Sequence, residues 1–92
     1  MNADTTVSLL IGRKIKSLRC SAGYTASEFA KLTGCKSEQQ LYRYERAVNK
    51  IDIDGLISML KSLDVNVSHF FDQIVEEAAE KSEEPEDYNV TV

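Results

Sequence analysis

One short stretch of the 92-residue chain gathers side chains that can recognise nucleic-acid bases. It contains Gln39, Gln40, Tyr42 and Arg43. A glutamine can bond adenine through both of its amide atoms, and an arginine can bond guanine bidentately, in each case from the major groove. The same residue types are common on solvated helix faces, so they alone leave both interpretations open.

Residues around this stretch complete a candidate DNA-binding surface. Glu38, just before the glutamines, would either face phosphates or accept a hydrogen bond from a cytosine amino group. Polar side chains on both sides along the chain could hold phosphates and so fix the position of the stretch on a duplex. These candidates are Thr25, Ser27, Lys36, Arg46, Asn49 and Lys50.

The chain offers few residues for other chemistry. Its only histidine, His69, has no partners for a Ser-His-acid arrangement, and its glycines are too scattered to form a phosphate-binding loop. The thiols of Cys20 and Cys35, together with that histidine, are too few for the ligand set of a structural zinc ion. We therefore expect no enzymatic activity, no metal and no cofactor, with His69 at the surface or the dimer interface and Cys35 in the core.

Length and charge bound the class of protein. Ninety-two residues suit one domain of modest stability, for which dimerisation is a natural remedy. No run approaches the roughly 18 apolar residues of a membrane span, and the first residues lack signal-peptide character, so we expect a cytoplasmic protein. Residues 1–71 hold 10 Lys/Arg and 7 Asp/Glu, a net charge of +3, whereas residues 72–92 hold 1 and 8, a net charge of −7. A mildly basic body that can face nucleic acid therefore precedes an acidic tail.

Helical periodicity and capping signals predict five short helices within residues 1–79. The first spans about residues 7–22, where apolar residues recur at helical spacing, and Gly23 is its expected left-handed stop. Thr25 and Glu28 have the spacing of a capping box at the start of the second helix.

The third helix is predicted to begin after Ser37, with Gln40 completing a second capping box. Leu41 and Tyr44 share one face of this helix, and the candidate base-reading side chains fall mostly on the other. Only residues 34–36 separate it from the second helix. Two short helices joined by so tight a turn are typical of a helix-turn-helix motif.

The last two helices have alternative starts. Asp52 or Asp54 can cap the fourth, and Asn66 or Ser68 can cap the fifth. All five helices are short and locally connected, which predicts a compact all-α domain rather than a long bundle.

Residues 80–92 form an acidic tail around the only proline, Pro85, and cannot bury a core. Residues 88–92 alternate bulky and polar side chains, so they are either a disordered end or a short strand that adds to a partner. The tail supports an alternative function: a protein-interaction module, such as an antitoxin or anti-repressor, with the helices as its scaffold.

Several segments in order make the chain similar to a known family. From about Leu10 to Asp72 it resembles a Cro/Xre-type helix-turn-helix domain of bacterial and phage regulators. The resemblance implies a five-helix Cro/repressor-like fold and a sequence-specific regulator that binds double-stranded DNA as a homodimer on a pseudo-palindromic operator. The segments that carry it are residues 11–19, 23–25, 29–34, 39–46, 49–51 and 63–71.

The resemblance also assigns structural roles. It implies that Arg19 and Glu45 form a partly buried pair that joins the first helix to the third. The fifth helix would supply the dimer surface through Phe70, Ile74 and Ala78. The competing interpretation is that such apolar residues only close the core of the monomer.

Three departures from the family pattern bear on DNA binding. Ala26 stands where the family often has a glutamine that holds a phosphate. The turn over residues 34–37 is one residue longer than usual, and Ala47 replaces the usual glycine after the third helix. We expect these changes to alter sequence specificity or to weaken DNA binding.

Overall fold

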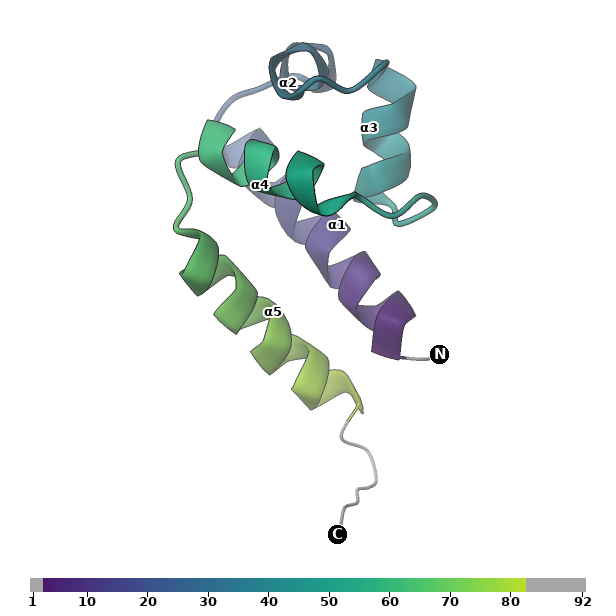
Figure 1. The fold of residues 1–92 in the computed structure, drawn as a ribbon, viewed down its shortest axis with the longest axis vertical. Helices are drawn as coiled ribbons and strands as arrows, with labels where there is room; N and C mark the ends of the chain where they lie inside the picture. The colour runs from purple at the N-terminus through teal and green to yellow at the C-terminus, as the bar shows by residue number, and fades with distance from the viewer. Residues whose placement is uncertain (1–2, 83–92) are drawn as a thin grey trace, which may run out of the picture.

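A computed structural model describes residues 3–82, which form five helices and no strand (Figure 1). The all-α, five-helix architecture predicted from the sequence is confirmed within these residues. The tail beyond residue 82, including the strand proposed at 88–92, lies outside them. The helices are α1 (Ala3–Ser21), α2 (Ala26–Thr33), α3 (Glu38–Glu45), α4 (Ile53–Ser62) and α5 (Val67–Ser82).

The start of α2 has the predicted geometry. The Thr25 hydroxyl oxygen accepts from the Glu28 backbone N–H at 3.1 Å, and a Glu28 carboxylate oxygen accepts from the Thr25 N–H at 2.9 Å. The rings of Tyr24 and Phe29 lie 5.7 Å apart, as in a hydrophobic staple. Gly34 ends the helix in the left-handed conformation, with φ of 78°. Local sequence signals thus fix both ends of this helix.

The start of α3 follows the prediction only in part. The Ser37 hydroxyl oxygen accepts from the Gln40 backbone N–H at 3.1 Å, as expected of a cap. The Gln40 side-chain oxygen, however, accepts from the Lys36 N–H at 2.7 Å, one residue earlier than a capping box requires. Gln40 therefore closes the turn between α2 and α3 as well as the helix.

The structure shows which of the two candidate residues caps each of the last two helices. Asp52 caps α4 and Asn66 caps α5, each accepting from a backbone N–H three residues on. The first helix begins at Ala3, earlier than predicted, and α5 continues to Ser82, beyond the predicted domain boundary at residue 79.

A single core lies between the helices. Helix α5 runs alongside α1 in the opposite direction, while α2, α3 and α4 close the other end of the molecule (Figure 1). Partly buried side chains, among them Cys35, pack against the core. Its buried apolar residues are Leu10, Ile15, Ala26, Phe29, Ala30, Leu41, Leu56, Met59, Leu60, Phe70 and Ile74.

The inner stripe of α5 faces the core of the monomer. Phe70 and Ile74 are 1% and 2% exposed, and Ala78 packs against the same core. The three residues recur every four positions, so they lie on one face of the helix, and that face contacts the rest of the monomer. Phe70 and Ile74 therefore lie in the core of the monomer, as the competing interpretation has it, and the dimer surface stays a prediction. Val75, on the other side of the same helix, is 66% exposed.

Candidate nucleic-acid interface

Helix α3 is held against α1 by a close backbone contact at Gly12. A Cβ atom at this position would lie 2.5 Å from the carbonyl oxygen of Glu45 and 2.6 Å from that of Tyr44. Such distances are far inside van der Waals contact, so only glycine permits this approach. Sequence analysis assigned no role to Gly12. A glycine inside a strongly helical segment, with no stop to form, was the available signal.

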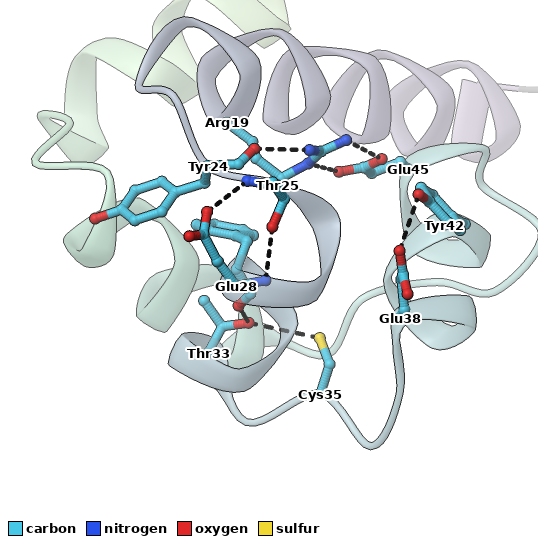
Figure 2. A network of polar contacts seen from close by, with 10 residues as sticks. Arg19, Tyr24, Thr25, Glu28, Thr33, Cys35, Glu38, Tyr42 and Glu45 are labelled. Carbon is cyan, nitrogen blue, oxygen red and sulfur yellow. Dashed lines mark hydrogen bonds and ion pairs between the residues drawn. The ribbon is translucent and has the colours of Figure 1, made fainter.

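A buried ion pair joins the same two helices (Figure 2). Arg19 Nε donates to Glu45 Oε2 at 2.7 Å and its Nη2 donates to Oε1 at 3.2 Å. The remaining Nη1 donates to the backbone oxygen of Tyr24 at 3.0 Å, at the entry to α2. One guanidinium therefore ties α1 to α3 and to the turn before α2.

The electrostatics of this pair favour its charged form. The hydrogen bonds that Arg19 donates to the Glu45 carboxylate raise the pKa of Arg19, burial opposes this rise, and the negative charge of Glu45 adds to it. Because the pKa of the guanidinium is raised, its stabilising effect is complete below the ordinary pKa of arginine. It is lost only as the pH rises through the still higher folded value. Deprotonation of Arg19 thus plays no part near neutral pH.

The opposite face of α3 is solvent-exposed and polar. Glu38, Gln39, Tyr42 and Arg43 are all exposed, whereas Leu41 on the inner face is completely buried. The Tyr42 hydroxyl donates to Glu38 Oε2 at 3.3 Å across one helical turn (Figure 2). The bond links two candidate base-reading side chains and leaves Gln39 and Arg43 beside them.

Gln40 differs from the other base-reading candidates. It is only partly exposed, and its side-chain oxygen is engaged by the backbone of Lys36. A glutamine needs both its oxygen and its nitrogen to bond adenine bidentately. In this conformation the Gln40 side chain stabilises the turn before α3 and is not free to bond a base. Sequence analysis missed this role because it treated the helix cap and the base-reading side chains separately.

The candidate phosphate ligands are all exposed, but Thr25 is already engaged. Its hydroxyl oxygen and its backbone N–H both bond Glu28 (Figure 2). The Glu28 carboxylate thus occupies a backbone donor at the N-terminus of α2, where an anion would otherwise bind. Ser27 lies in the same first turn, with its side chain exposed.

The loop after α3 folds back along the helix. The backbone N–H groups of Val48 and Asn49 donate to the Arg43 carbonyl oxygen at 2.9 and 3.3 Å. This return brings Asn49 beside the C-terminal end of α3, with Lys50 next to it in the chain. Ala47 makes the reversal in the left-handed conformation, with φ of 61°. The chain therefore keeps a left-handed residue here without the family's glycine.

The departure at Ala26 removes a polar side chain from the surface. Ala26 is 5% exposed and belongs to the core. Its methyl side chain has no polar atom with which to bond a phosphate.

Two further properties concern residues 3–82. Within that range no group of three or more His, Cys, Asp or Glu side chains is placed to hold a metal ion. None of the helices described there is long and apolar enough to cross a membrane.

The fold and this surface define a helix-turn-helix domain, in which α2 and α3 are joined by a short turn and α3 presents its polar face outward. A family model described as helix-turn-helix matches residues 15–70, more than half of the chain. The chain belongs to the Cro/Xre-type helix-turn-helix family of transcriptional regulators.

Two relatives share 34% identity with the chain over 70 residues. They are uncharacterised HTH-type transcriptional regulators of Rickettsia conorii and Rickettsia prowazekii. The aligned region covers 76% of this chain but only 55% and 53% of the relatives, so the chain spans about half the length of the curated relatives it matches. No solved structure matches it significantly.

Proposed function

We propose that this protein is a sequence-specific, double-stranded DNA-binding regulator that acts as a homodimer in the bacterial cytoplasm. The observation that carries the proposal is the exposed polar face of α3, on a helix whose other side is fixed to α1 by Gly12 and the Arg19–Glu45 pair. A rigidly held helix can place its side chains on base edges with little further loss of entropy. A flexible helix would lose more entropy when its side chains are placed on base edges.

In this proposal the exposed side chains of α3 read bases in the major groove. Arg43 bonds guanine, Gln39 bonds adenine, and the Glu38–Tyr42 pair presents a carboxylate that accepts from a cytosine amino group. Gln40 supports them by holding the turn that precedes the helix. The phosphate contacts come from Ser27, Lys36, Arg46, Asn49 and Lys50, with the Thr25 hydroxyl as a further donor.

The dimer would place its two α3 helices in successive major grooves, roughly 34 Å apart, over a pseudo-palindromic operator. Because Phe70 and Ile74 are buried, we assign the part of the dimer surface that α5 supplies to Val75 and the partly exposed Phe71. Val75→Asp should then weaken the dimer in sedimentation experiments without lowering the melting temperature of the monomer. An unchanged dimer would remove this face from the interface.

Arg43→Ala tests whether the exposed side of α3 reads bases. We call this side, formed by Glu38, Gln39, Tyr42 and Arg43, the reading face. We expect Arg43→Ala to reduce the ratio of specific to non-specific affinity by about 10- to 100-fold, because a good bidentate contact contributes about 1–3 kcal/mol of discrimination. Lys61→Gln, which removes an exposed cation from α4, is the control and should retain the ratio. Competition between the selected duplex and random duplexes measures the ratio of specific to non-specific affinity. An unchanged ratio for Arg43→Ala would remove that residue from the site.

A further inference from the structure

A groove of about 470 Å³ lies between the outer side of α1 and the C-terminal end of α3. Sequence analysis gave no function to the part of α1 that forms it. The residues that line the groove are Leu9, Arg13, Lys16, Ser17, Cys20, Glu45 and Arg46.

The lining of this groove is positively charged. Arg13, Lys16 and Arg46 are exposed, and among residues 3–82 no carboxylate forms an ion pair with any of them. The one acidic residue in the lining, Glu45, has both carboxylate oxygens bonded to Arg19. Its charge is therefore compensated, and three cations from two elements surround one opening.

The groove adjoins the proposed reading face. Arg46 caps the C-terminus of α3 and follows Arg43 by three residues and Tyr42 by four, so these side chains lie along one side of the helix. A DNA strand whose bases meet α3 must carry its backbone past the end of that helix. At this end Arg13 and Lys16 of α1 line the same groove as Arg46.

We infer that the groove binds a backbone phosphate of DNA, and that Arg13 and Lys16 of α1 belong to the DNA-binding surface together with Arg46. The guanidinium groups can bond phosphate oxygens bidentately, and the lysine adds a mobile point charge. Ser17 and Cys20 also line the groove, and their small side chains leave room for the sugar–phosphate chain to approach. This inference rests on the proposed function and extends the interface beyond the helix-turn-helix itself.

The test is the salt dependence of binding to a short duplex, followed by fluorescence anisotropy for the wild type and for the double variant Arg13→Gln/Lys16→Gln. Each phosphate contact contributes a slope of about −0.9 in log affinity against log salt. We expect the variant to lose close to two units of slope. We also expect it to bind selected and random duplexes about 10- to 100-fold more weakly at 0.1 M salt, by the same factor for both.

The matched control is Lys31→Gln/Lys61→Gln, which makes the same change in net charge at exposed positions outside the groove. It should keep the slope within about half a unit. Thermal melting of both variants checks that the fold is intact. A groove variant with the wild-type slope and affinity, from wild-type protein that does bind DNA, would overturn the inference alone. Failure of the wild type to bind any duplex would instead overturn the proposed function.

Discussion

The two sides of α3 differ in almost every physical property. The side that faces α1 holds a fully buried leucine, a backbone contact that excludes any Cβ, and an ion pair whose two residues are 6% and 3% exposed. The outward side holds exposed polar groups, with one weak bond between Glu38 and Tyr42. One eight-residue helix therefore carries on one side the groups that fix its position and on the other the groups that, in the proposed function, read DNA. Substitutions on one side should change stability, and those on the other should change DNA binding.

The largest effect should come from breaking the buried pair. Glu45→Ala leaves the Arg19 guanidinium buried without its carboxylate, which costs about 3–5 kcal/mol. A urea titration followed by circular dichroism measures the change. Glu38→Ala, on the exposed side of the same helix, is the matched control and should change stability by less than about 0.5 kcal/mol. If Glu45→Ala unfolds like the parent but loses DNA, Glu45 acts in recognition and the division between the two sides fails.

Gly12→Ala should come next in size. The added methyl group meets backbone oxygens of α3, which cannot move without shifting the helix, so we expect a loss of about 1–3 kcal/mol. Gly55→Ala is the comparison, because its methyl group would meet chiefly the Asp52 carboxylate, which caps α4 by accepting from the Gly55 N–H, so we expect it to cost about 1 kcal/mol at most. Thermal melting compares the two. Equal melting temperatures for both variants would show that α1 and α3 are not in backbone contact.

A smaller effect, of opposite sign, is expected at the end of α3. Ala47→Gly relieves a left-handed alanine and should stabilise the protein by about 0.5–1 kcal/mol after the entropy of the unfolded chain is counted. Ala79→Gly, at an exposed helical position in α5, should destabilise it by a similar amount. Differential scanning calorimetry measures whether each variant is more or less stable than the wild type. A destabilising Ala47→Gly would mean that the loop does not use this conformation.

The smallest change in stability is expected on the reading face. Tyr42→Phe removes only an exposed hydroxyl that bonds Glu38, and the free energy of unfolding should change by less than about 0.5 kcal/mol. We nevertheless expect its base preference at one operator position to relax, because the Glu38 carboxylate loses its orienting partner. Deep sequencing of selected duplexes compares the variant with the wild type. An unchanged preference would separate Glu38 and Tyr42 from the site.

Local signals in the sequence predicted most of the architecture. The capping residues Thr25, Ser37 and Asp52 act on backbone groups within three positions, so their spacing alone identified the helix starts. The close contact at Gly12 could not be predicted in this way, because it depends on a helix 33 residues away in the chain. Its physical reason exists only after α3 has packed on α1.

The functional surfaces were harder to predict from the sequence than the helices, because they too depend on how the helices pack. An apolar stripe at Phe70, Ile74 and Ala78 has the same spacing whether it faces a second subunit or its own core. In the structure α5 packs on α1, and this stripe lies against the core. The polar face of α3 was correctly predicted as exposed, but the engagement of Gln40 by Lys36 depends on the path of the turn, which its sequence does not define.

The proposal that the outward face of α3 reads DNA is tested most directly by a selection of random duplexes on the purified protein at about 0.15 M salt, with Arg43→Ala selected in parallel. We expect the wild type to enrich a two-fold motif whose half-sites lie about one helical turn apart, and the variant to lose preference at one position in each half-site. Enrichment of the same motif by both proteins, or no enrichment by folded wild type, would contradict the claim that the outward face of α3 reads DNA.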